Sequence, residues 1–96
     1  MVKIDLSLTN KTLYEGCDIT EVGGRLSLTT PPEMASNIVG RNIAALVAVT
    51  TDRSEVTLTG PMAVWAYLVA FHLVVHAFGK VWYEDGRSAP LLIAQH

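Results

Sequence analysis

Apolar and polar positions alternate at the start of the chain, and this pattern predicts a half-buried strand over Val2–Leu8. A second strand is expected just after the turn at Thr9–Lys11. The Gly23-Gly24 pair marks another turn or a bulge, and Arg25–Thr29 is predicted to be a short strand. The N-terminal part is therefore expected to consist of strands joined by turns.

A helical pattern follows. Thr30 has the position of a helix cap, two prolines come directly after it, and Glu33 completes a capping box. The helix is predicted to run to about Val49, and Gly40 weakens it in the middle by up to about 1 kcal/mol. Its apolar stripe is expected to contain Met34, Ile38, Ile43, Leu46 and Val47.

The second half of the chain has a more legible pattern, in which strand, helix, strand, turn and strand follow one another. A strand–helix–strand crossover implies a parallel pair of strands with a right-handed connection, and a ligand is then expected at their carboxyl ends. The predicted fold class is α/β, with mixed α+β as the alternative: a single small domain over residues 1–96 with one mixed sheet and two helices. The predicted elements are Glu55–Thr59, Met62–Phe78, Lys80–Glu84, Asp85–Ser88 and Pro90–Ala94.

The long apolar helix needs a choice between core and membrane. Residues 61–81 are almost free of charge, but His72 and His76 interrupt them and Lys80 closes the run. A core helix is therefore expected rather than a membrane span. The two histidines share one helix face at spacing i, i+4. The opposite face is expected to be core, with Val64, Leu68, Phe71, Val75 and Phe78.

The composition narrows the classes of partner. The net charge of −2 argues against long duplex nucleic acid, which needs a basic surface. Half of the 96 residues are hydrophobic, and the surplus apolar surface of so small a chain predicts a homo-oligomer. The single cysteine, Cys17, cannot form an internal disulfide. The first residues, MVKIDLSL, lack the apolar run of a signal peptide, so export is not expected. A cytoplasmic location is the simplest expectation.

Three residues near the predicted sheet suit phosphodiester chemistry. His76 can transfer a proton, Arg87 can bind a phosphate oxyanion, and Asp85 can bind a hard cation. The helix end and the turn border the same sheet, so these three side chains are predicted to meet in one pocket. A solvated hairpin turn and interface histidines are the plainer alternatives for the same residues.

Two further groups bear on ligand binding. Gly60-Pro61 lies between a predicted strand and a helix start, where free backbone N–H groups can hold a phosphate or ribose oxygen; the alternative is a plain tight turn. His72, His76, Cys17 and His96 are conceivable zinc ligands. No CxxC or HExxH spacing is present, so a zinc site is not favoured.

The last two fifths of the chain resemble a known family. Thr59-Gly60-Pro61 precedes an apolar helix with Trp65 near its start, and His76 follows near the helix end. Eight residues separate His76 from the Asp85-x-Arg87 motif, and a strand leads to His96. This order is similar to that of the small manganese-dependent CRISPR-associated ring nucleases of type III systems. His72 and the apolar helix end depart from the family, and the N-terminal half offers no match.

The resemblance implies a function for each matching residue. The family's catalytic residues fall on His76, Asp85 and Arg87, with Asp85 also holding Mn²⁺, or Mg²⁺ in its place. The resemblance also implies a Rossmann-like core related to the CRISPR cyclic-nucleotide sensor domains. The substrate-binding residues would be Thr59, Gly60, Pro61 and His96. His72, which has no counterpart in the family, is also expected to bind substrate because it shares a helix face with His76.

The implied substrate is cyclic tetra-adenylate, cut to linear di-adenylate, which would switch off antiviral signalling. A homodimer would match the two-fold symmetry of this ring. Family members also stack dimers on both faces of the ring, so a tetramer or a ligand-bridged stack of dimers can be needed for a complete site. Two other functions stay open: a non-catalytic cyclic oligoadenylate-binding or sensor module, and a structural oligomerisation domain.

Overall fold

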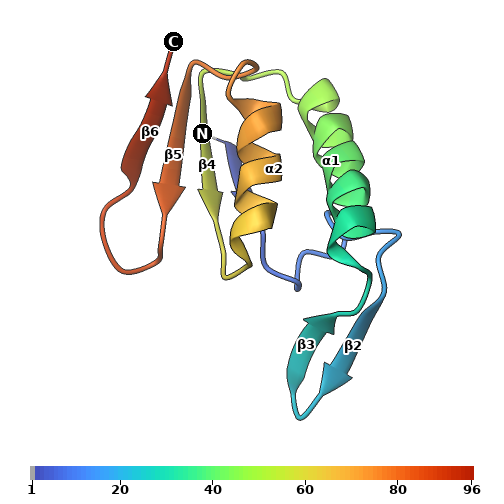
Figure 1. Ribbon diagram of the computed structural model, residues 1–96. Coiled ribbons are helices and arrows are strands. Elements are labelled where there is room, and N and C mark those ends of the chain that lie inside the picture. Colours follow the sequence, from blue (N-terminus) through green and yellow to red (C-terminus); the bar gives the residue numbers. More distant parts are fainter. Residues whose placement is uncertain (1) are drawn as a thin grey trace.

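The computed structural model describes residues 2–96, which form a four-stranded sheet, two helices and a separate two-stranded hairpin (Figure 1). The α/β class, with a mixed sheet and two helices, is confirmed. The strands are β1 (Val2–Asp5), β2 (Ile19–Val22), β3 (Arg25–Leu28), β4 (Glu55–Thr59), β5 (Lys80–Glu84) and β6 (Leu91–Gln95); the helices are α1 (Pro32–Val49) and α2 (Val64–Val74).

The main sheet has the order β1-β4-β5-β6. β4 is parallel to both β1 and β5, whereas β6 is antiparallel to β5. The parallel pair that the sequence predicts around α2 is thus confirmed. The carboxyl ends of β1, β4 and β5 all lie at one edge of the sheet, which we call the carboxyl edge (Figure 1). The connection from β5 to β6, residues 85–90, lies at the same edge and is longer than a tight hairpin turn.

The core lies between the sheet and the two helices, which pack side by side (Figure 1). Small residues determine which helix face is innermost, because they let the backbones approach closely. α2 buries Ala66, Ala70 and Val74, while Val64 and Leu68 are 72% and 64% exposed. The expected core face of this helix is therefore wrong at these two positions, although Phe78 is buried.

The innermost face of α1 is also displaced from the predicted one. Ala35, Val39 and Ile43 are its buried residues, whereas Met34 and Leu46 are exposed. Thr30 does not cap this helix: its Oγ1 accepts the backbone N–H of Asp18 at 2.7 Å instead. The capping box is therefore wrong, because the hydroxyl is engaged by the chain that precedes β2.

Several element boundaries differ from the prediction. β1 ends at Asp5, and turns occupy most of the stretch to Cys17 where the sequence predicts a second strand. α2 is shorter than predicted and begins at Val64, three residues after Pro61. Within residues 2–96, neither helix combines the length and the apolar character needed to cross a membrane.

The β2–β3 hairpin projects beyond the carboxyl edge (Figure 1, bottom). Its turn is Gly23-Gly24, with φ of +59° and +78°, a conformation that glycine adopts without strain and that suits a two-residue hairpin. At its base the N–H of Thr29 donates to the carbonyl of Asp18 at 2.9 Å. None of residues 19–28 is fully buried, and Ile19 at the base of the hairpin is the residue that packs against the core.

Candidate functional site

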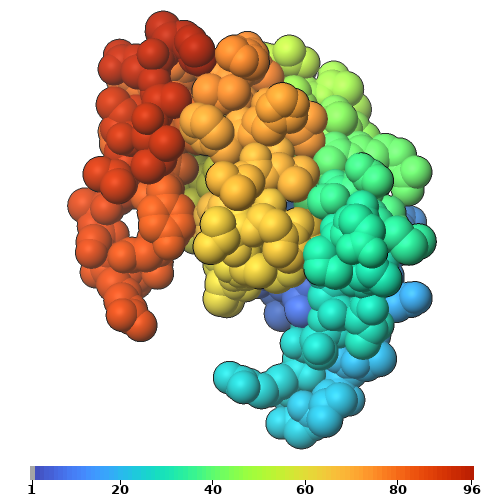
Figure 2. Space-filling view, in the orientation of Figure 1, coloured from blue at the N-terminus to red at the C-terminus, as the bar shows by residue number. Residues whose placement is uncertain are grey.

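Two cavities adjoin at Pro61 on the carboxyl edge, and we call them together the carboxyl-edge cleft. One cavity of about 340 Å³ lies between the end of β4 and the turn after β5, where Asp85 and Gly86 line it. The other, of about 660 Å³, lies between Pro61 and the β2–β3 hairpin, where Arg25 lines it. Figure 2 shows the hollow between the hairpin and the 85–90 loop.

Gly60 forms the floor of this cleft in a conformation that only glycine adopts easily. Its φ is +101°, and a Cβ there would collide with Oδ1 of Asp5 and lie 2.8 Å from the backbone nitrogen of Ser7. The hydroxyl of Tyr67, on α2, donates to the Gly60 carbonyl at 2.5 Å. The floor is therefore held from two sides, by the turn after β1 and by the first helical turns of α2.

Thr59 ties the three parallel strands together just before this floor. Its carbonyl accepts the N–H of Leu6 at 2.7 Å, and its hydroxyl donates to the carbonyl of Glu84 at 3.0 Å. Because the hydroxyl acts here as a donor, its oxygen lone pairs stay available to a ligand. Thr59 and Gly60, both predicted to bind substrate, therefore line the cleft and also fix its shape.

Asp85 begins the second wall of the cleft. Its Oδ1 accepts the backbone N–H groups of Arg87 at 2.8 Å and of Ser88 at 2.9 Å. These hydrogen bonds, that from Ser88 first, hold the pKa of the Asp85 carboxyl below its usual range. At neutral pH this exposed side chain is a carboxylate, which suits it to bind a cation and makes it a poor proton donor and a weak base.

The charges on the cleft walls are of opposite sign. Glu84 and Asp85 line the β5 side, and Arg25 lines the hairpin side. Among residues 2–96 the one ion pair joins Nζ of Lys3 to Oε1 of Glu84, at 3.5 Å. Neither Arg25 nor Arg87 is therefore paired with a carboxylate of the described residues. Both guanidinium groups are free to meet an anion.

The metal ion implied by the resemblance would have Asp85 as its protein ligand. In the described part, no three His, Cys, Asp or Glu side chains gather in a metal-holding arrangement. Oδ1 of Asp85 already accepts two backbone N–H groups, so a bound Mn²⁺ or Mg²⁺ would depend on its Oδ2 and on further ligands from the substrate, water or a second copy. The conceivable zinc ligands, which include Cys17 and His72, do not come together either.

His76 lies at the other end of the sheet from Asp85. α2 ends at Val74, so His76 belongs to the turn that leads into the amino end of β5. His96 joins it there: its N–H donates to the carbonyl of Gly79 at 2.8 Å, and its ring centroid lies 5.8 Å from that of His76. Asp85 follows the last residue of β5, roughly 20 Å away at about 3.3 Å per residue.

The prediction that His76, Asp85 and Arg87 share one pocket is therefore wrong for a single chain. The reason is the crossover itself, because the helix end that precedes a parallel strand lies at that strand's amino end and the turn that follows it lies at the carboxyl end. The predicted site is thus divided into two halves, His76 with His96 at one end of the sheet and Asp85 with Arg87 at the other. The side chains of both halves are exposed.

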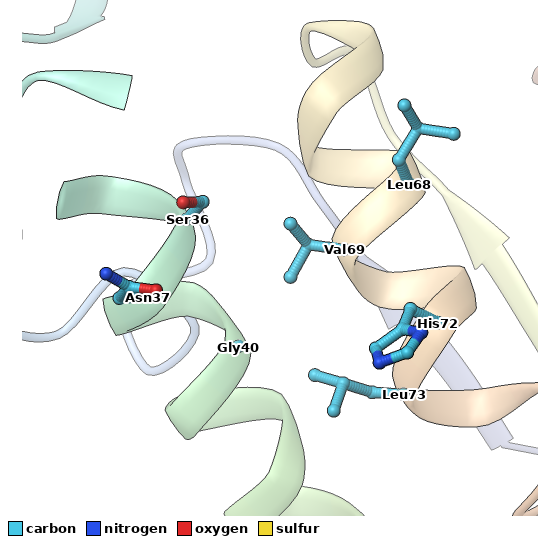
Figure 3. A pocket seen from close by; sticks show the side chains of 7 residues that line it. All are labelled: Ser36, Asn37, Gly40, Leu68, Val69, His72 and Leu73. Carbon is cyan, nitrogen blue, oxygen red and sulfur yellow. The ribbon is translucent and has the colours of Figure 1, made fainter. Parts of the chain in front are cut away.

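His72 belongs to neither half. It lines an open groove of about 380 Å³ between α1 and α2, together with Ser36, Asn37 and Gly40 (Figure 3). In that view Val69 and Leu73 point from α2 toward Gly40. The groove lies between the helices, so the substrate-binding role predicted for His72 has no support from its position.

Sequence reasoning missed the residues that shape the cleft. The position of Asp5 could have indicated it, since Asp5 ends a strand whose carboxyl end is expected to border a ligand site. Tyr67 and Arg25 had no such indication, because one lies within an apolar helix and the other beside a common glycine turn.

Comparison with known proteins adds no further assignment: no protein-family model, curated protein or solved structure matches this chain.

Proposed function

We propose that this protein is a ring nuclease that binds cyclic tetra-adenylate and cuts it to linear di-adenylate, and so ends type III CRISPR signalling in the cytoplasm. The carboxyl-edge cleft carries the proposal. It lies where open parallel sheets bind ligands, and the Thr59-Gly60-Pro61 and Asp85-x-Arg87 motifs line or border it. A Rossmann-like core related to the CRISPR sensor domains is part of this proposal.

The chemistry needs a proton acceptor, a proton donor and positive charge at the phosphate. The ribose 2′-oxygen attacks the adjacent phosphorus and loses its proton, while the 5′-oxygen leaves and gains one. His76, with His96 beside it, supplies the proton transfer, and Arg87 neutralises charge on the phosphate oxygens. Asp85 is the protein ligand we assign to Mn²⁺, or Mg²⁺, which when bound would offset further phosphate charge.

These groups come from two copies in the proposed enzyme. One copy contributes Asp85 and Arg87 at its carboxyl edge, and another contributes His76 and His96 from the opposite edge. The ring lies between the two surfaces, as in a tetramer or a ligand-bridged stack of dimers. Exposed apolar side chains on α2 and β6 support a homodimer as the unit of this assembly; they are Val64, Leu68, Leu91, Leu92 and Ile93.

A non-catalytic binding module is the second candidate. The observation that favours it is that the described residues of one chain bring no histidine to the cleft and no metal-holding cluster anywhere. Such a module would bind or sequester the cyclic nucleotide through the same cleft and leave the ring intact.

Incubation with cyclic tetra-adenylate in Mn²⁺ or in EDTA, with products resolved by chromatography, tests the proposal. We expect linear di-adenylate that needs the metal and that disappears in the His76→Ala variant. His72→Ala is the matched control and should cut at the wild-type rate, because its groove is separate from both halves. An intact but bound ring under every condition would favour the binding module, and no binding would overturn both.

A further inference from the structure

One face of the β2–β3 hairpin is directed toward the cleft. Register pairs Thr20 with Ser27 and Val22 with Arg25, so these four side chains lie on one face of the hairpin. All four line the cavity whose other side is Pro61. The hairpin is therefore the wall opposite the 85–90 loop (Figure 2). Pro61 lines both cavities and so lies between the two walls.

This wall offers two kinds of contact side by side. Val22 is 70% exposed, and its neighbour Arg25 has no carboxylate within ion-pair distance among residues 2–96. The Gly23-Gly24 turn places these two residues directly opposite one another as the pair that closes the hairpin. A free guanidinium can bind a phosphate, and an apolar side chain beside it can make van der Waals contact with the attached base.

The base of the hairpin holds this wall in position. The N–H and the hydroxyl of Thr29 both donate to the Asp18 carbonyl, at 2.9 Å and 3.0 Å, and the Asp18 N–H donates to Thr30 at 2.7 Å. Thr30 itself is buried directly before α1. The wall is thus anchored to the folded core even though its own side chains are exposed.

We propose that the hairpin is a substrate-recognition element, in which Arg25 binds a phosphodiester of the bound nucleotide and Val22 contacts the adjoining base. This inference rests on the proposed function, since it assigns the hairpin to the same cleft. It adds a second cation to Arg87, on the wall of the cleft that faces Glu84 and Asp85.

The test is isothermal titration of cyclic tetra-adenylate, and of linear tetra-adenylate, in EDTA. Arg25→Ala is expected to weaken binding at least ~10-fold, and the salt slope of log K to fall by about 0.7, as for one lost phosphate contact. Val22→Ala should weaken binding without changing the salt slope. Arg41→Ala, on the exposed side of α1, is the matched arginine control and should bind as wild type.

The outcomes separate this inference from the proposed function. If the wild type binds the ring and Arg25→Ala, shown to be folded by circular dichroism, binds it equally well, the hairpin assignment is overturned and the ring nuclease proposal stands. If only the linear adenylate binds, with the Arg25 dependence, the hairpin assignment stands and the ring nuclease proposal does not. Binding of neither nucleotide overturns both.

Discussion

The rings of His76 and His96 lie 5.8 Å apart at the amino end of β5, while Asp85 follows the carboxyl end of the same strand. Two groups proposed to act on one phosphate are thus separated by the full length of a strand. If His76 and Asp85 act on the same phosphate, they must come from different copies of the chain. This can be tested by mixing variants, because a site made within one chain would not be restored by mixing.

Mixing two inactive variants is the first prediction. His76→Ala and Asp85→Ala should each lose at least about 100-fold in cleavage rate. An equimolar mixture should recover about a quarter of the wild-type rate, because a quarter of randomly assembled sites take an intact Asp85 from one copy and an intact His76 from another. Cleavage is measured by chromatography of the products. A mixture as inactive as its components would contradict a shared site.

Gly60→Ala should disrupt the floor of the cleft. Its φ of +101° strains any other residue, and the carboxylate of Asp5 occupies the space that a methyl group would need. We expect a loss of more than about 2 kcal/mol in the free energy of unfolding, measured with urea. Gly86→Ala is the matched control. Its φ is also positive, at +83°, but a Cβ added there would have no atom within 4 Å apart from its chain neighbours. This variant should lose only about 1 kcal/mol in the free energy of unfolding. Equal losses would show that the contact with Asp5 does not matter.

Gly40→Ala, in contrast, should raise the free energy of unfolding. A Cβ at Gly40 would lie 3.6 Å from Val69 and 3.8 Å from Leu73, which are ordinary contacts (Figure 3). Alanine also favours the helix, so we expect a gain of about 0.5–1 kcal/mol in a thermal or urea melt. Gly79→Ala should instead destabilise, since its Cβ would fall 2.9 Å from the carbonyl oxygen of Ser54. A loss in Gly40→Ala would mean that the helices need a closer approach than this.

Tyr14 should make the fold sensitive to alkali. Its hydroxyl donates to the carbonyl of Leu6, and burial raises the pKa of Tyr14 to about 12. The unfolded chain ionises this group near pH 10, so the stability it contributes is complete below pH 10 and is lost as pH rises toward 12, on the order of 2 kcal/mol. Burial raises the pKa of Tyr67 as well, with the same sign.

Urea unfolding at pH 8 and at pH 11 measures this effect. Tyr14→Phe should be about 1 kcal/mol less stable than wild type at pH 8, because Leu6 loses its donor. The difference should narrow or reverse at pH 11. A variant that loses as much stability with pH as the wild type does would show that Tyr14 is not the group responsible.

The second half of the chain is the more predictable one. Glu55–Thr59 and Lys80–Glu84 are found with the predicted bounds, because short apolar strands on either side of one long apolar helix leave a single simple topology. The helix faces are less predictable: α2 is apolar nearly all round, so hydropathy does not distinguish Ala66 and Ala70 from Leu68. The small size of the alanines decides between them, because it lets the helix pack closer to its neighbours. The pattern of apolar residues alone does not show which face does so.

The candidate site is predictable in its parts but not in its assembly. Asp85, Arg87 and Gly60 lie at or beside one cleft, as their strand-end positions suggest. The sequence groups His76 with them because a helix end and a turn border the same sheet, but the parallel crossover puts these two at opposite ends. Arg25 carries no signal, since nothing in its local spacing connects a hairpin tip to a sheet edge formed much later in the chain.

The hairpin has a consequence for how such a protein could change. Because none of residues 19–28 is fully buried, a different tip or a longer hairpin would leave the core untouched. Ligand preference could then drift from one oligonucleotide size to another without a compensating change elsewhere. If the hairpin recognises the ligand as proposed, its sequence sets selectivity while the sheet and helices set stability, and exchanging the hairpin alone would change the first without the second.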